Sequence, residues 1–177
     1  MMLALRYTPA PWRVKHRVIW YALPKAVLVA VAVILDDAGR VLMLRARYSG
    51  HWLLPGGAIE AGEDPVTGLL RECREELGAA VALQRLTGIY TDPAQRETFF
   101  AFRCTPLGAP LRLSVEHEAW RYVRPEDVRW PLRVMVRDAL VASSDVVMRR
   151  VHRSGREDMF PNRAPDHDGV GSSGGCP

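Results

Sequence analysis

Three glutamates at helical spacing, Glu72, Glu75 and Glu76, are the side chains of this sequence best placed to do chemistry. Residues three and four apart share one patch of a helix, where like charges repel by a few tenths of a kcal/mol per pair. Carboxylate oxygens gathered in this way suit a hard divalent cation such as Mg²⁺ or Mn²⁺. The alternative interpretation is a solvated acidic face whose charges are paired with Arg71 and Arg74.

The helix that carries these glutamates has a clear beginning and end in the sequence. Asp64 can accept hydrogen bonds from the free amides at the helix start, and Pro65 suits the first helical position. Gly78 can adopt the left-handed conformation that ends a helix. Apolar residues between these ends recur at spacings of three and four and predict a buried face: Val66, Leu69, Leu70, Cys73 and Leu77.

The residues on both sides of the glutamates form a longer pattern. It reads Gly57, five residues, Glu63, seven residues, Arg71-Glu72-Cys73, one residue, Glu75-Glu76, one residue, Gly78-Ala79. This pattern resembles the signature of the Nudix hydrolases, with Cys73 and Ala79 in its two apolar positions. The resemblance covers about residues 26 to 141. It implies an α+β protein with the Nudix fold, an α/β/α sandwich with a mixed central sheet.

The resemblance also implies an activity and a set of roles. The expected enzyme is a pyrophosphohydrolase that needs Mg²⁺ or Mn²⁺ and cleaves the diphosphate linkage of a nucleoside diphosphate joined to another group. The expected metal-binding residues are Gly57, through its carbonyl, Glu72, Glu75, Glu76 and Glu116. The expected catalytic residues are Arg71, which orients the carboxylates, Glu72, Glu75 and Glu63. One of the helix glutamates could act as the general base.

Two of these assignments leave alternatives open. Glu63 could be catalytic or a structural partner of Arg71. Glu116 is preferred to Glu118 because of its distance from Tyr122, but a solvated acidic loop would explain the segment as well. His117, between the two glutamates, is expected to be a surface or packing histidine rather than a ligand.

Substrate contacts are expected from arginines and aromatic residues. The arginines Arg45, Arg47 and Arg96 could meet phosphates, although strand and loop arginines are often simply solvated. The aromatic residues Trp52 and Tyr90, like Tyr48, could stack on a base or pack in the core. Pro93, fifteen residues past Gly78, resembles a proline of ADP-ribose pyrophosphatases. The competing substrates are nucleoside triphosphates and oxidised nucleotides, and the competing function is a non-catalytic nucleotide sensor or interaction module.

The surrounding chain is expected to form one domain. Strands are predicted over 26–35, 40–48, 81–90, 97–104 and within 116–123, and a helix over 133–142 that could continue to about residue 151. We expect an N-terminal extension at 1–25 that could form a short helix, the Nudix domain at 26–152, and a disordered tail at 153–177.

Composition excludes several other classes of protein. The formal charge of +4 comes without a dense basic run, and an anionic small molecule or no partner at all explains it as well as nucleic acid does. The resemblance implies a small nucleotide as the partner and makes nucleic acid the less favoured one. Three scattered cysteines indicate neither a disulfide framework nor a zinc site and favour the cytoplasm. The apolar run at 26–35 is too short to span a membrane. The N-terminal segment could pack on the domain, mediate a homodimer or, less favoured, touch a membrane surface.

Overall fold

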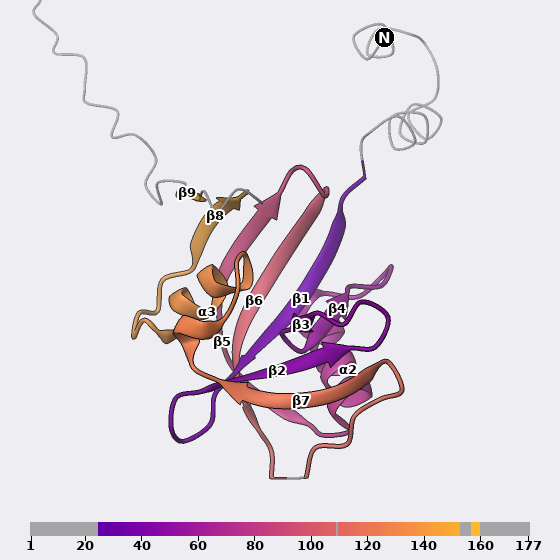
Figure 1. The fold of residues 1–177 in the computed structure, drawn as a ribbon. Coiled ribbons are helices and arrows are strands. Elements are labelled where there is room, and N and C mark those ends of the chain that lie inside the picture. The colour runs from indigo at the N-terminus through magenta and orange to yellow at the C-terminus, as the bar shows by residue number, and fades with distance from the viewer. Residues whose placement is uncertain (1–24, 109, 153–156, 160–177) are drawn as a thin grey trace, which may run out of the picture.

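The computed structural model describes residues 25–108, 110–152 and 157–159 of the chain. Its helices and strands are β1 (Val27–Ile34), β2 (Val41–Ala46), β3 (Trp52–Leu53), β4 (Gly56–Ala58), α2 (Pro65–Leu77), β5 (Val81–Asp92), β6 (Glu97–Pro106), β7 (His117–Val123), the 3₁₀ turn η2 (Pro125–Asp127), α3 (Leu132–Leu140), β8 (Val147–Val151) and β9 (Glu157–Met159). The strands form a six-stranded sheet in the order β4-β1-β6-β5-β8-β9 and a three-stranded sheet in the order β3-β2-β7 (Figure 1).

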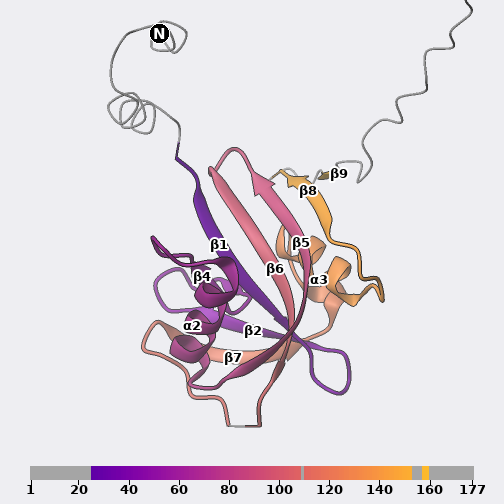
Figure 2. The ribbon, with the colours of Figure 1, turned by 180° about the vertical axis from the view of Figure 1, so that it is seen from behind.

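The larger sheet is mixed, as the sequence predicts. Strand β1 runs parallel to β6 and antiparallel to β4, while β5 and β6 form a long antiparallel hairpin. Strand β8 then pairs in parallel with β5. In the smaller sheet, β2 is antiparallel to both neighbours. Figure 2 shows the long β5–β6 hairpin beside β1, with α2 next to β4 and α3 next to β5.

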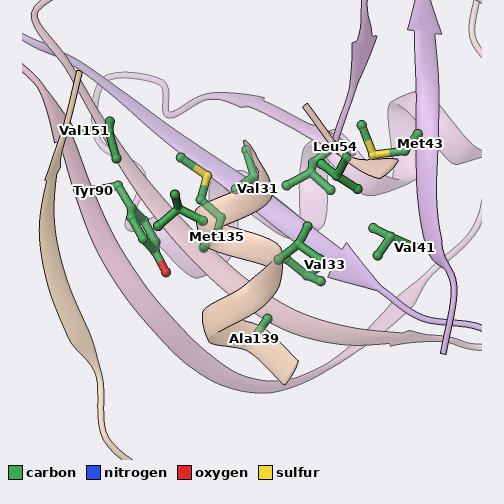
Figure 3. Packing of buried hydrophobic residues seen from close by; sticks show 13 residues of the cluster. Val31, Val33, Val41, Met43, Leu54, Tyr90, Met135, Ala139 and Val151 are labelled. Carbon is green, nitrogen blue, oxygen red and sulfur yellow. The ribbon is translucent and has the colours of Figure 1, made fainter. Parts of the chain in front are cut away.

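Two hydrophobic cores lie on opposite faces of the sheets. Side chains alternate along a strand, so neighbours on β1 point to different cores. Val31 and Val33 pack with α3, whereas Ala30 and Ala32 pack with α2. Figure 3 shows the core on the α3 side, with Met135 of the helix among valines from the strands. A helix on each face makes the α/β/α sandwich that the sequence predicts.

The predicted continuation of the last helix to residue 151 is wrong. Helix α3 ends at Leu140, and Val147–Val151 form β8 instead. Carbonyl groups at the helix end are satisfied from the sheet, because Arg85 donates to Val141 O at 2.6 Å and Arg103 donates to Ala139 O at 3.1 Å. These long-range bonds fix where the helix stops. The local composition of the segment carries no sign of them.

The two ends of the chain can be compared with prediction only in part. The proposed N-terminal helix lies outside the described residues, as does most of the tail. Residues Glu157–Met159, predicted to be disordered, form a strand that pairs with β8. Within the part of the chain that the structure describes, no helix is long and apolar enough to cross a membrane.

Candidate active site

Helix α2 begins and ends as its sequence predicts. The Asp64 carboxylate accepts hydrogen bonds from the amides of Val66, at 2.8 Å, and Thr67, at 3.0 Å. Gly78 takes a φ of 60°, and its N–H donates to Arg74 O at 3.0 Å. The helix buries Leu69, Cys73 and Leu77 against the sheet, so its three glutamates are held on a rigid element.

Arg71 connects the helix to the loop that precedes it. Its guanidinium donates to both carboxylate oxygens of Glu63, at 2.9 and 3.0 Å, and to the carbonyl of Ala58 at 3.0 Å. It also donates to Glu72 at 2.9 Å and to Glu75 at 3.3 Å. The structure therefore brings three of the predicted carboxylates, Glu63, Glu72 and Glu75, around the guanidinium of Arg71. In this arrangement Glu63 is a structural partner of the arginine.

Two glycines let the loop backbone approach the carboxylates closely. A Cβ atom on Gly57 would lie 2.5 Å from a carboxylate oxygen of Glu72. Gly56 has a φ of +132°, which L side chains rarely adopt, and its N–H donates to Glu76 Oε2 at 2.7 Å. A side chain at Gly57 would push against Glu72 on the helix, and one at Gly56 would collide with the backbone of Ala30 on β1.

Glu76 is the most buried of the three helix glutamates, with an exposed fraction of 7%. Burial raises the pKa of this carboxyl to about 8, with the Gly56 N–H acting in the opposite direction and the charges of Glu72, Glu116 and Glu75 adding to the rise. No arginine or lysine of the described residues forms an ion pair with it. A cation bound at this cluster would compensate its charge.

His117 is a neighbour of this site that the sequence analysis did not assign to it. The side chain is buried, and its Nε2 lies 3.4 Å from Glu76 Oε1. Burial lowers the pKa of the imidazole, against the opposing charges of Glu116 and Glu72. The available signal was the position of His117 directly after the candidate ligand Glu116.

The two acidic residues that flank His117 have different surroundings. The charge of Glu116 contributes to the raised pKa of Glu76. Glu118 instead forms an ion pair with Arg45, with a distance of 3.0 Å between Nε and Oε1. The charge of Glu116 thus acts on Glu76, whereas the Glu118 carboxylate is paired with Arg45, and the metal-binding role of Glu116 stays a prediction.

The candidate phosphate-binding arginines are spread over the structure. Arg47 donates from Nε to Val115 O at 3.0 Å and lines a surface hollow of about 360 Å³ together with Tyr48, Val115 and Glu116. Arg45 is paired with Glu118, as described above. Arg96 lies in the turn between β5 and β6 with a φ of 56°, and its carbonyl accepts from the amide of Val27 at 2.8 Å.

The two aromatic candidates are both occupied by contacts within the protein. The guanidinium of Arg121 lies over the Trp52 ring, 4.0 Å from its centre. Tyr90 has no exposed surface, packs in the core on the α3 side (Figure 3), and donates its hydroxyl to Asp138 Oδ2 at 3.0 Å. The prediction that Tyr90 binds substrate is therefore wrong, since a side chain buried on this side of the sheet cannot stack on a base.

The carboxylate cluster fits a hard cation by its donor chemistry, which is oxygen only. Within the described ranges, no three acidic, histidine or cysteine side chains already converge on a single point. Arg71 holds Glu72 and Glu75, and Glu76 is turned toward Gly56 and His117. Binding of a cation between these side chains would therefore require Glu72 and Glu75 to rotate away from Arg71.

Comparison with known proteins identifies the family. Residues 25–143 match the sequence model of the NUDIX domain. A MutT-like protein of Streptomyces ambofaciens is 40% identical over 103 residues, which cover 58% of this chain and 66% of the relative, just under two thirds. The nucleoside triphosphatase NudI of Escherichia coli is 31% identical over 110 residues, 54% of this chain and 78% of the relative.

Comparison with solved structures finds the same fold in known proteins. An ADP-ribose pyrophosphatase from Streptococcus suis superposes with a TM-score of 0.58 at 21% identity, covering 71% of this chain and 98% of that one. A match of this identity speaks for the fold alone. Together with the match to the domain family and the carboxylate-bearing helix, it shows that the chain belongs to the Nudix hydrolase family, as the pattern from Gly57 to Ala79 predicts.

Proposed function

We propose that this protein is a divalent-metal-dependent pyrophosphohydrolase that cleaves the diphosphate linkage of a nucleoside diphosphate joined to another group. The observation that carries the proposal is Glu76, a buried carboxylate without a cationic partner in the described structure, beside Glu72 and Glu75 on one helix. A non-catalytic Nudix domain would gain nothing from burying a carboxyl group that has no cationic partner.

The proposed roles follow from the contacts of each residue. Glu72, Glu75, Glu76, Glu116 and the carbonyl of Gly57 would hold Mg²⁺ or Mn²⁺. Such a cation, when bound, neutralises phosphate charge and lowers the pKa of an attacking water. One of the carboxylates would accept the proton of the attacking water. Arg71 keeps the helix carboxylates and the loop in register through its bonds to Glu63 and Ala58.

The substrate class is narrowed by two observations. The nucleoside triphosphatase named above is 31% identical to this chain over 110 residues, and this likeness favours a nucleoside triphosphate, normal or oxidised. ADP-ribose stays a candidate through the proline pattern at Pro93. Near the cluster, the hollow beside Arg47 offers an arginine for a phosphate and the Tyr48 ring for a base. Trp52 and Arg45 could join after release from Arg121 and Glu118.

We also propose that the protein works on small molecules in the cytoplasm. The two cysteines that the structure describes, Cys73 and Cys104, are buried free thiols, which suits a reducing compartment. A homodimer stays a proposal that gel filtration with light scattering can test directly.

The proposed function is tested by phosphate release across a nucleotide panel with Mg²⁺ or Mn²⁺ at mildly alkaline pH, coupled to a phosphatase. The panel contains nucleoside triphosphates, oxidised dGTP, ADP-ribose, dinucleoside polyphosphates and nucleotide sugars. Glu72→Gln is assayed beside the wild type, with the exposed Glu126→Gln as the matched control.

We expect turnover of one substrate class that is lost in Glu72→Gln and kept in Glu126→Gln. Tight nucleotide binding without turnover by a folded, metal-supplied protein would instead support the sensor. Equal turnover in Glu72→Gln and the wild type would remove the helix carboxylates from the mechanism.

A further inference from the structure

The end of helix α2 is covered by a segment from a distant part of the chain. This capping segment, residues 112–117, leads into β7. The amide of Arg112 donates to the carbonyl of Leu77 at 2.7 Å, and the amide of Ser114 donates to the carbonyl of Glu76 at 3.1 Å. The last carbonyls of a helix have no partner within the helix, so these bonds stabilise its end and fix the segment against it.

His117 is held in place at the end of this capping segment. Its amide donates to the carbonyl of Ser114 at 3.2 Å, and its Nδ1 lies 3.3 Å from the Ser114 hydroxyl. Pairing with Ala46 across the β2–β7 ladder anchors its backbone on the other side. The ring is thus positioned by two independent elements, and its Nε2 lies 3.4 Å from Glu76 Oε1.

The contact between the two side chains completes the surroundings of Glu76. Its Oε2 accepts from Gly56 at 2.7 Å, so Oε1 is the oxygen that depends on His117. If the Ser114 hydroxyl donates to Nδ1, the proton of a neutral ring sits on Nε2 and faces the carboxylate. The separation of 3.4 Å is longer than the usual N–H···O distance of about 2.9 Å, and a small rotation of either side chain would close it.

We propose that His117 is a positioning residue, which orients the Glu76 carboxylate through Nε2 so that this carboxylate can serve a divalent cation. Ser114 supports it by selecting the tautomer of the ring. This inference rests on the proposed function, because Glu76 must be a metal ligand for its orientation to matter. Groups that orient metal ligands typically change metal affinity or activity by about 10- to 100-fold when they are removed.

Substitution by two amides of different length separates this role from simple packing. The side-chain nitrogen of Gln reaches about as far from the backbone as Nε2, whereas that of Asn reaches only about as far as Nδ1. His117→Gln can therefore still donate to Glu76, while His117→Asn and His117→Leu cannot. Thr87→Val is the matched structural control, because it removes a buried hydroxyl of β5 that donates to Ala101 O on β6 at 2.9 Å and, within the described structure, bonds to no carboxylate of the cluster.

The experiment measures Mn²⁺ affinity without nucleotide, by calorimetry or by the electron paramagnetic resonance of free Mn²⁺, together with kcat, KM and the melting temperature. We expect His117→Asn and His117→Leu to lose about 10- to 100-fold in Mn²⁺ affinity and kcat, with KM nearly constant. His117→Gln should stay within about three-fold of the wild type, and Ser114→Ala should fall between. Thr87→Val should lower the melting temperature only.

The inference is overturned if His117→Asn binds Mn²⁺ as tightly as the wild type, or if Gln and Asn at this position are equally impaired. Because Gln and Asn are compared directly, the test does not depend on whether His117→Leu folds. If the wild type itself binds no Mn²⁺, the proposed metal-dependent function fails together with the inference. If the wild type binds Mn²⁺ and the substitutions have no effect, the inference alone fails.

Discussion

Two buried carboxylates, Glu76 on α2 and Asp138 on α3, have the same exposed fraction of 7% but very different partners. Asp138 accepts two hydrogen bonds from Arg149, at 2.7 and 3.0 Å, and one from Tyr90 at 3.0 Å. Glu76 accepts a hydrogen bond from the backbone amide of Gly56 and lies near the imidazole of His117. Burial therefore does not by itself mark a functional carboxylate. A carboxylate whose charge is compensated inside the protein stabilises the fold, and one that lacks compensation is available to an external cation.

The largest effect should come from removing the uncompensated charge. Glu76→Gln keeps the shape of the side chain but weakens its ability to bind a cation, so we expect turnover to fall on the order of 10²–10⁴-fold. Steady-state kinetics of the preferred substrate with Mg²⁺ measure this effect. Near-normal kcat in the variant would show that catalysis does not need the charge of Glu76.

The compensated carboxylate should show the opposite pattern. Asp138→Ala removes the buried carboxylate that pairs with Arg149, whose side chain is only 11% exposed. We expect a loss of about 3–5 kcal/mol in the free energy of unfolding, since removing one partner of a buried ion pair is strongly destabilising. Urea denaturation measures the loss, and kcat of the protein that remains folded should be nearly unchanged. A large fall in kcat with normal stability would reverse the roles assigned to the two sites.

A third effect depends on pH. The pKa of Glu76 is about 8 in the fold, against an ordinary value of 4.5 in the unfolded chain. The folded state thus binds more protons between these values, and the metal-free protein should lose stability as pH rises from 4.5 to 8. The loss should be on the order of a few kcal/mol and absent in Glu76→Gln.

Melting curves in a chelator at several pH values test this sign, with the variant as the reference. Added Mn²⁺ should restore the stability of the wild type at alkaline pH. If the melting temperatures of the two proteins change with pH in the same way, the charge of Glu76 is already compensated in the fold. Glu76 and Asp138 would then not differ in this respect.

The smallest effect sharpens the description of the Asp138 site. Tyr90→Phe removes one hydrogen bond to a charged group and should cost about 1.5–3 kcal/mol. Because Tyr90 lies in the core rather than at the substrate, KM should stay at the wild-type value for every nucleotide. Chemical denaturation and KM measurements check both parts, and a raised KM would return Tyr90 to the list of substrate contacts.

Features that depend on neighbours in the chain could be predicted well. The cap at Asp64, the stop at Gly78 and the apolar face of α2 all arise from residues within a few positions of one another. Helix geometry alone then places Glu72, Glu75 and Glu76 together. The sequence by itself therefore determined the helix, its carboxylates and, through the pattern from Gly57 to Ala79, the family.

Only the tertiary structure decided which buried groups are compensated. Val147–Val151 form a strand because they pair with β5, and Arg85 binds the carbonyl of Val141 just past the end of α3. Tyr90 lies in the core, where its hydroxyl donates to Asp138 on α3. His117 likewise lies beside Glu76 only because the capping segment, residues 112–117, binds the last carbonyls of α2. Such contacts join residues far apart in sequence, and local patterns carry no record of them.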